Sequence, residues 1–135
     1  MREISFSEEE IDSILNILYR HGEMPMEICK GIREIWFKNE NGAELRILFL
    51  STLKLTVSRV CFEHRRTGTM TEIFAFLKEF CEKNQIQLLS IQSVETPEMA
   101  AWCKKQHIDP NPYASISIPE AGFTLGDYDL KLAGI

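Results

Sequence analysis

The chain lacks the features that mark several large classes of protein. Its 135 residues contain no apolar run that approaches the ~20 residues of a membrane-spanning helix, and the first four residues contain no apolar signal core. A net charge of −5 argues against a general nucleic-acid binder, which usually has a basic surface. These absences predict a cytoplasmic protein that has neither a membrane nor a nucleic acid as its partner.

Signals for metal sites and disulfides are also missing. The four cysteines, Cys29, Cys61, Cys81 and Cys103, form no CxxC pair, and their spacing fits no zinc module. No cluster of His, Cys and Asp has the spacing of metal ligands, and no Gly-x-Ser-x-Gly motif is present. We therefore expect no metal, and we expect the cysteines to be small buried hydrophobes in a reducing compartment.

What is present is the composition of a folded globular protein. Hydrophobic residues make up 44% of the chain and charged residues 26%. A chain of this length buries about two-thirds of the surface that its unfolded state exposes, so it needs no metal or disulfide for stability. We expect a single domain over residues 1–135.

The N-terminal quarter predicts a strand, a helix and one ambiguous segment. Residues 2–6 alternate in polarity, which predicts a short first strand. Ser7 and Glu10 have the spacing of a capping box, and the apolar residues that follow mark one face of a helix ending near Gly22. Residues 24–31 are ambiguous, with a short second helix as one interpretation.

The next segment predicts a meander of strands. Asn39-Glu40-Asn41-Gly42 indicates a hairpin between the runs 32–37 and 45–50, because an Asn-Gly pair tolerates the positive φ of a tight turn. The run 53–62 predicts a third strand in the same sheet. A wide apolar stripe over 69–84 then predicts a helix.

The C-terminal half predicts a crossover and a closing hairpin. The run 87–94 predicts a strand parallel to 53–62, joined to it by a right-handed crossover through the helix. Thr96 and Pro97 open another helix that runs to about residue 106. Residues 109–112 predict a turn, and residues 113–118 and 128–132 predict an antiparallel pair.

The segment Arg65-Arg66-Thr67-Gly68-Thr69-Met70 lies between the strand over 53–62 and the helix over 69–84. The first N–H groups of a helix have no partner within the helix, and its dipole adds positive charge there, so this end is an anion site. Arg65 and Arg66 add charge, and Gly68 lets the backbone approach a phosphate closely. The segment therefore predicts a pyrophosphate site. The alternative is an ordinary strand-to-helix turn with solvated arginines.

This motif and the element order resemble the GNAT acetyltransferases, which use acetyl-coenzyme A. In that family an apolar strand end precedes Arg/Gln-x-x-Gly-x-Gly/Ala and a helix; here Val60 ends the strand, and residues 65–70 fill the motif. The next helix of the family begins at an Asn, carries a Tyr seven residues later and ends at Gly-Phe. Here Thr96, Cys103 and His107-Ile108 occupy those positions, so the catalytic helix is degenerate. The resemblance implies an α/β fold with a mixed, mostly antiparallel sheet and a central β-α-β crossover that binds the coenzyme.

The resemblance also implies a coenzyme site. Backbone groups at Ser58, Arg59 and Val60 would meet the pantetheine arm, and the N–H groups of residues 66–71 would hold the pyrophosphate. The implied coenzyme-binding residues are Ser58, Arg59, Val60, Arg65, Arg66, Thr67, Gly68, Thr69, Met70 and Thr71. Met70 replaces a small residue, and its side chain either crowds the phosphate or points into the core.

Two residues are the candidates for proton transfer. GNAT enzymes often take a proton from the attacking amine with a carboxylate on a strand, and Glu95 at the end of the run 87–94 is the nearest one here. Its alternative is a solvated residue near a helix N-terminus. Cys103 replaces the proton-donating Tyr of the family, and its alternative is a buried packing residue beside Trp102.

The leading functional hypothesis is an N-acetyltransferase that binds acetyl-coenzyme A as co-substrate and transfers acetyl to a small-molecule or peptide amine. Direct attack of the amine is expected, because no covalent nucleophile is evident. The alternatives are a GNAT-fold binding or regulatory protein that has lost catalysis, and a protein with the fold that binds no coenzyme. A homodimer is compatible with the sequence.

Overall fold

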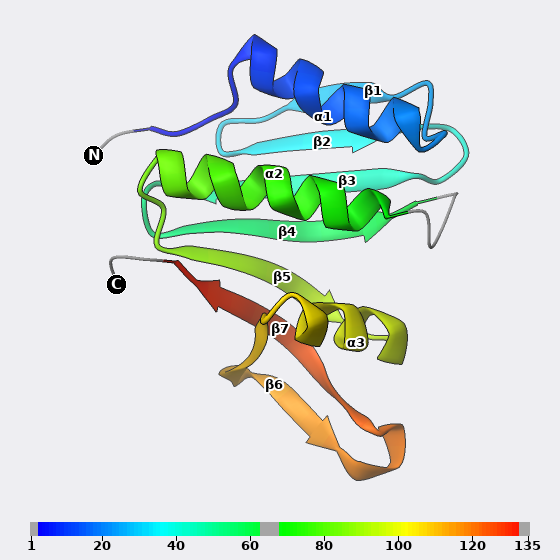
Figure 1. The fold of residues 1–135 in the computed structure, drawn as a ribbon, viewed down its shortest axis with the longest axis vertical. Helices are drawn as coiled ribbons and strands as arrows, with labels where there is room; N and C mark the ends of the chain where they lie inside the picture. Colours follow the sequence, from blue (N-terminus) through cyan, green and yellow to red (C-terminus); the bar gives the residue numbers. More distant parts are fainter. Residues whose placement is uncertain (1–2, 63–67, 133–135) are drawn as a thin grey trace.

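A computed structural model describes residues 3–62 and 68–132 (Figure 1). The elements in chain order are α1 (Glu8–Arg20), β1 (Glu27–Lys30), β2 (Glu34–Lys38), β3 (Glu44–Leu50), β4 (Lys54–Cys61), α2 (Thr69–Lys83), β5 (Leu88–Val94), α3 (Pro97–Lys105), β6 (Asp109–Ile118), a 3-10 turn (Pro119–Ala121) and β7 (Phe123–Lys131). The strands form one sheet in the order β1-β2-β3-β4-β5-β7-β6. β4 and β5 are parallel, and the other neighbouring pairs are antiparallel. The predicted fold class, a mixed and mostly antiparallel sheet with a central β-α-β crossover, is therefore confirmed.

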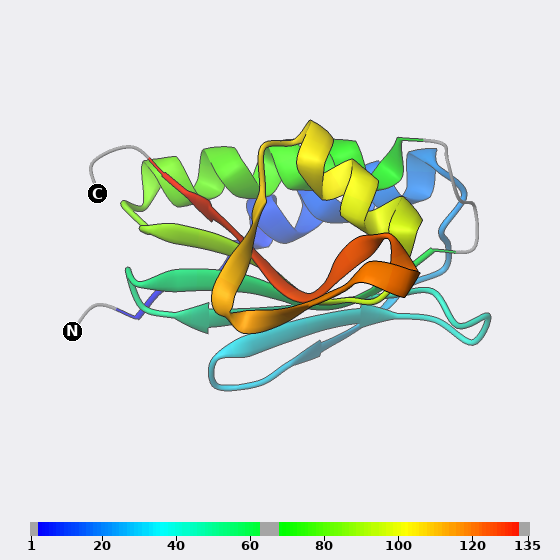
Figure 2. The ribbon, with the colours of Figure 1, turned by 90° about the horizontal axis from the view of Figure 1, so that it is seen from below.

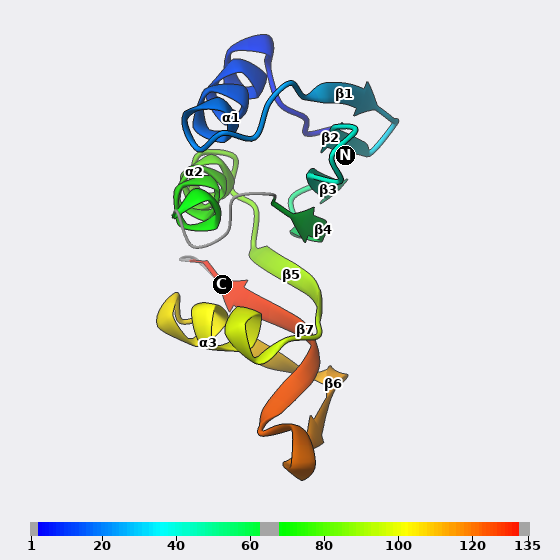
Figure 3. The ribbon, with the colours of Figure 1, turned by 90° about the vertical axis from the view of Figure 1, so that its right-hand side faces the viewer.

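The helices α1, α2 and α3 lie on the same face of the sheet (Figures 2 and 3). The core between the two layers contains fully buried side chains from the strands and from α1 and α2, among them Ile14, Phe37, Ile47, Val57 and Leu77. In the part of the chain that the structure describes, no helix covers the opposite face of the sheet (Figure 3). That open face carries most of the polar side chains of the sheet, because neighbouring residues of a strand point to opposite faces.

The helix starts follow the local sequence signals. Ser7 and Glu10 form the predicted capping box, with the Glu10 N–H donating to Ser7 Oγ at 3.2 Å and the Ser7 N–H donating to Glu10 Oε1 at 2.8 Å. Thr96 Oγ1 accepts the N–H of Met99 at 3.2 Å at the start of α3. Both helices therefore begin where the sequence predicted.

Two predictions in the N-terminal quarter are wrong. Residues 3–7 form no strand, although Ile4 and Phe6 are buried. The ring of Phe6 packs edge-on against Phe49, with centroids 5.0 Å apart, and against Phe80, with centroids 4.7 Å apart. The alternation therefore reflects burial against α2 and β3 and not pairing with another strand. The ambiguous segment 24–31 contains strand β1, which pairs with β2, and not the short helix that was one interpretation.

The remaining elements agree with the sequence except at the starts of β6 and β7. The hairpin of β2 and β3, the strand β4, the helix α2 and the strand β5 lie where they were predicted. β6 and β7 pair antiparallel as predicted, but β7 begins at Phe123 and not at residue 128. The turn predicted over 109–112 is wrong, because β6 begins at Asp109, which pairs with Asp129. The pairing of β6 with β7 then shifts between Pro110 and Ser115, so the turn residues form an irregularity inside the strand.

Candidate coenzyme and acceptor site

The parallel strands β4 and β5 pair over only four residues and then part. Residues 54–57 of β4 pair with residues 88–91 of β5. Beyond that point, within residues 3–62 and 68–132, the end of β4 pairs with β3 alone and the end of β5 with β7 alone. Figure 1 shows the two strands diverging toward their C-terminal ends. This fork leaves one backbone edge of residues 58–61 without a neighbouring strand.

Irregularities on both sides of the fork bend the strands apart. In β4, Ser58 is the extra residue between the pairs Arg46↔Arg59 and Ile47↔Val57, and its Oγ donates to the Arg46 carbonyl at 3.4 Å. In β5, Ser93 has a φ of 57°, and its N–H donates to Asp127 Oδ1 at 2.9 Å. An extra residue in one strand increases the local twist and bends the strand, so the two irregularities account for the fork.

The first turn of α2 lies near the open end of the fork (Figure 1). Its N-cap is Gly68, with a φ of 87° and no side-chain oxygen to accept an N–H from the first turn. The 15 residues of α2 give it a full dipole whose positive end is at Gly68. Met70 packs against the core, which agrees with the second of its two alternatives. The start of α2 thus combines N–H donors, a positive potential and, at Gly68, a residue without a side chain.

The structure brings part of the predicted coenzyme set to this place. Ser58, Arg59 and Val60 form the free edge of β4, and residues 68–71 form the start of α2. The side chain of Arg59 is engaged elsewhere, because its Nε donates to Glu44 Oε1 at 2.6 Å. Arg65, Arg66 and Thr67 lie outside the described residues.

A contact that the sequence did not predict joins α3 to the start of α2. Trp102 Nε1 donates to Thr71 Oγ1 at 3.0 Å, and the Trp102 ring packs edge-on against Phe74 with centroids 5.3 Å apart. The side chain of Trp102 therefore fixes the first turn of α2 from the side. The one feature of the sequence that drew attention to Trp102 was its place beside Cys103, the residue that replaces the Tyr of the family.

A second contact, also missed, joins the end of α1 to the first turn of α2. Glu72 Oε2 lies 2.8 Å from the Arg20 guanidinium, and Glu72 Oε1 lies 3.0 Å from His21 Nε2. The hydrogen bond from His21, together with the charge of Arg20, lowers the pKa of Glu72 below its usual value. The two side chains from the end of α1 thus hold the Glu72 carboxylate in the first turn of α2.

The two candidate proton-transfer residues have different environments. Glu95 is exposed at the end of β5. Cys103 is completely buried on the inner side of α3, and burial raises the pKa of its thiol to about 12. The pKa of Tyr128 is also raised, by burial and by the charge of the Cys103 thiolate. The structure therefore places Glu95 in solvent and Cys103 in the core.

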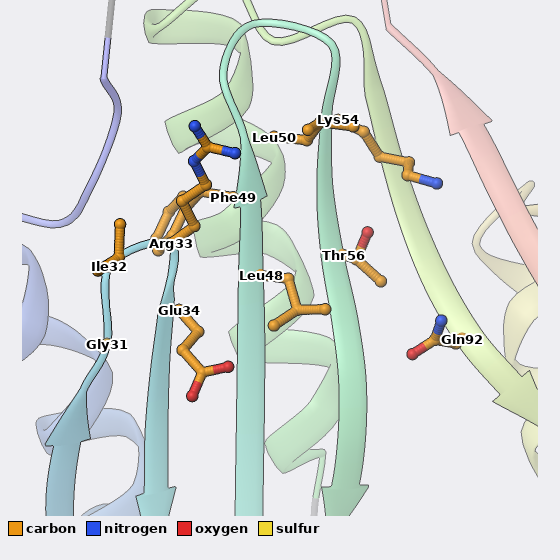
Figure 4. A pocket seen from close by; sticks show the side chains of 10 residues that line it. All are labelled: Gly31, Ile32, Arg33, Glu34, Leu48, Phe49, Leu50, Lys54, Thr56 and Gln92. Carbon is orange, nitrogen blue, oxygen red and sulfur yellow. The ribbon is translucent and has the colours of Figure 1, made fainter.

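Two hollows lie on the described surface near the sheet. The first, which we call the sheet-face hollow, has a volume of about 550 Å³ and lies on the open face (Figure 4). Its lining consists of residues 31–34, residues 48–50 of β3, Lys54 and Thr56 of β4, and Gln92 of β5. The second, which we call the hairpin hollow, has a volume of about 370 Å³. Its lining consists of Ser93 and Glu95 after the fork, residues 113–116 of β6, and Leu125 and Gly126 of β7.

The two hollows differ in charge. Arg33 and Lys54 line the sheet-face hollow, and neither makes an ion pair with the described residues. The carboxylate of Glu34 in the same hollow is held by Arg46 at 2.5 Å. Among the described residues that line the hairpin hollow, the only charged side chain is Glu95. The sheet-face hollow therefore suits an anion and the hairpin hollow a cation.

The described residues contain no group of three or more His, Cys, Asp or Glu side chains that could hold a metal ion. In the same residues, no helix has both the length and the apolar character to cross a membrane.

Comparison with known proteins identifies the fold. No family model matches the sequence. No curated protein matches it either. Solved structures match over nearly the whole chain. A candidate acetyltransferase from Agrobacterium tumefaciens has a TM-score of 0.54 and 15% identity, covering 98% of this chain and 97% of its own.

Two further structures give the same result. A candidate acetyltransferase of the GNAT family from Desulfovibrio desulfuricans has a TM-score of 0.53 and 13% identity, covering 95% of this chain and 84% of its own. A candidate acyl-CoA N-acyltransferase from Klebsiella pneumoniae has a TM-score of 0.51 and 12% identity, covering 97% and 95%. At these identities the likeness is one of fold. The chain therefore has the fold of the GNAT acetyltransferases.

Proposed function

We propose that this protein binds acetyl-coenzyme A in the fork between β4 and β5 and transfers the acetyl group to an amine. The observation that supports this most directly is the fork itself. Two parallel strands pair over four residues and then part, and the start of α2 lies near the open end. This arrangement offers unpaired backbone groups to an extended ligand and helix N–H groups to an anion.

In this proposal the coenzyme is bound mainly by backbone groups. The free edge of Ser58, Arg59 and Val60 exchanges hydrogen bonds with the amides of the pantetheine arm, as a neighbouring strand would. The N–H groups of residues 66–71 and the dipole of α2 hold the pyrophosphate. Arg65 and Arg66 add positive charge at that end of the site. Because backbone groups bind the coenzyme, the side chains of Ser58 and Arg59 can keep their contacts with β3.

The chemistry proposed is direct attack of the amine on the thioester carbonyl. A nitrogen–carbon bond forms, the carbon–sulfur bond breaks, and the coenzyme leaves as a thiolate. Glu95 or a water next to it takes the proton from the amine. Burial and a thiol pKa of about 12 favour the packing alternative for Cys103 over proton donation. A thiolate with an ordinary pKa near 8.5 needs no dedicated acid in order to leave.

A second candidate function is a GNAT-fold protein that binds the coenzyme without turnover. The burial of Cys103, at the position where the family carries a Tyr, favours it. The exposure of Glu95 also favours it, because a solvated carboxylate lacks the environment that tunes a catalytic base.

Two measurements separate the proposals. Isothermal titration with acetyl-coenzyme A tests the site, and we expect one coenzyme per chain. Release of free thiol from acetyl-coenzyme A, followed across a panel of amines, tests catalysis. Binding with amine-dependent thiol release supports the enzyme. Binding without release across the panel favours the non-catalytic protein, and absence of binding contradicts both.

A further inference from the structure

We infer that the hairpin hollow binds the acyl acceptor, and that the acceptor is a primary amine with an apolar body and no anionic group. The inference rests on the proposed function, because it names the substrate class for that reaction. It depends on three observations about the hollow: what forms its walls, what fixes their shape, and which charges face it.

The walls carry large apolar side chains that the described part of the chain leaves exposed. Tyr113 is 97% exposed and Ile116 is 66% exposed, although both line a concave surface. Leu125 of β7 lies in the same lining. An exposed aromatic ring that borders a hollow offers a face to a cation and apolar area to a carbon chain. The walls thus suit a ligand with an apolar body.

The wall that contains Tyr113 is held in shape by one side chain. Asn111 Oδ1 accepts the N–H groups of Tyr113 at 2.8 Å and of Ala114 at 3.2 Å. Asn111 Nδ2 donates to Asp129 Oδ2 at 2.7 Å, and the Asn111 carbonyl accepts from Ser115 Oγ at 2.6 Å. These bonds anchor the irregular part of β6 to β7. The backbone that presents Tyr113 is therefore preorganised, which lowers the entropic cost of binding.

The floor of the hollow requires a glycine. Gly126 has a φ of 120°, and a Cβ built there would lie 2.3 Å from the carbonyl oxygen of Ala114. The backbones of β6 and β7 therefore approach each other closely at Gly126. A side chain at this position would push the two strands that line the hollow apart.

The carboxylates at the hollow favour an amine that carries no anionic group. Glu95 lines the hollow, and the carboxylate of Asp127 lies beside it, held by the N–H of Ser93 at 2.9 Å. An ammonium group is attracted to this place, whereas an amine that also carries a carboxylate brings a like charge to it. The sheet-face hollow, with Arg33 and Lys54, would suit such an anionic acceptor instead. Glu95 is also the residue proposed above as the base.

Phenethylamine and phenylalanine form a matched pair of probes, because they differ only by a carboxylate. Titration of each into the ¹⁵N-labelled protein without coenzyme reports binding by shifts of backbone signals. We expect phenethylamine to shift the signals of residues 93–95, 113–116 and 125–126. We expect phenylalanine to bind there more weakly by about five-fold or more, as a like charge near an exposed carboxylate would cause.

Substitutions test the walls and the charge separately. Tyr113→Ala should weaken phenethylamine binding by about three-fold, the size of an exposed cation–π contact. Glu95→Gln should weaken it by about two- to five-fold. Ile32→Ala, which changes a 93% exposed side chain of the sheet-face hollow, is the matched control and should leave binding unchanged. Each of these side chains is exposed, so the variants are expected to keep a native spectrum.

The outcomes distinguish this inference from the proposed function. If the protein does not bind acetyl-coenzyme A, the proposed function is overturned. The amine titration still reports on the hairpin hollow, because it is done without coenzyme. Shifts confined to the sheet-face hollow, or tighter binding of phenylalanine, would overturn the inference and place an anionic acceptor on the open face. An absence of shifts with either probe would overturn it as well.

Discussion

Trp102 Nε1 donates a hydrogen bond of 3.0 Å to Thr71 Oγ1, and this bond joins α3 to the first turn of α2. The two residues are 31 positions apart in the chain. The same indole packs edge-on against Phe74, one turn further along α2. The start of α2 carries the proposed pyrophosphate site, so a side chain of α3 positions the N–H groups on which the coenzyme would depend.

Trp102→Phe tests this relationship, because phenylalanine keeps a ring against Phe74 and removes the donor. We expect the free energy of unfolding to fall by about 1 kcal/mol, the net value of one hydrogen bond. Acetyl-coenzyme A affinity should also fall, because the first turn of α2 is less firmly held. Thr71→Val removes the acceptor, and the double variant should lose less than the sum of the two single losses. Additive losses in urea unfolding would show that the bond is not made in solution.

Gly68 should matter for the coenzyme, whereas Gly42 should matter for stability only. The two glycines have similar φ values, 87° and 91°, and a Cβ at either would meet nothing within 4 Å. Gly68→Val and Gly42→Val should therefore each lower the free energy of unfolding by at least about 1 kcal/mol, the cost of a left-handed backbone for a residue with a Cβ. Only Gly68→Val should abolish acetyl-coenzyme A binding, because its side chain fills the space of the phosphate. Equal affinity of the two variants for acetyl-coenzyme A in a titration would show that the pyrophosphate does not bind at the start of α2.

Glu72 should contribute to the pH dependence of stability. Its pKa is lowered in the folded state, chiefly by the hydrogen bond from His21, so its contribution is present above the pKa of the unfolded chain. That contribution is lost as the pH falls from the pKa of the unfolded chain through the lowered value of the folded state. Glu72→Gln should be less stable than the parent at pH 7 and should lose less stability on acidification. Glu79→Gln, on the exposed side of the same helix, is the control and should keep the pH dependence of the parent.

The cysteines should differ sharply in reactivity. Burial raises the pKa of Cys81 and of Cys103 to about 12, whereas Cys61 is exposed and Cys29 is partly exposed. In the native protein a thiol reagent such as DTNB should modify Cys61 first and Cys29 more slowly. Cys81 and Cys103 should react only on unfolding. Rapid modification of Cys103 in the native state, seen by mass spectrometry of peptides, would contradict its burial.

Glu95→Gln tests the proposed base. If the protein transfers acetyl, turnover should fall by at least about tenfold while acetyl-coenzyme A affinity stays nearly unchanged. Cys103→Ala should cost less turnover, because a thiolate can leave without a proton donor. Glu98→Gln, another exposed carboxylate at the start of α3, is the control for charge alone. Equal turnover in Glu95→Gln and the parent would remove Glu95 from the mechanism.

The sequence by itself determined most of the elements and their order. The capping box of Ser7 and Glu10, the cap at Thr96 and the hairpin at Gly42 are interactions between residues a few positions apart. Such signals are complete within a short segment, so the sequence predicts them correctly. The crossover from β4 through α2 to β5 was also predicted from the sequence, because a parallel pair of strands needs a connection about as long as a helix.

Tertiary structure decided what the residues do at the site. Nothing local shows that residues 4 and 6 pack into the core without pairing, or that the turn residues of 109–112 become part of β6. The hydrogen bond between Glu72 and His21 spans 51 positions, and the wall at Tyr113 depends on Asn111 bonding to Asp129. The fork arises from irregularities in two strands that face different neighbours. Contacts of this kind form only when distant segments pack together, because their energy depends on the positions of several side chains at once and not on the pattern within one.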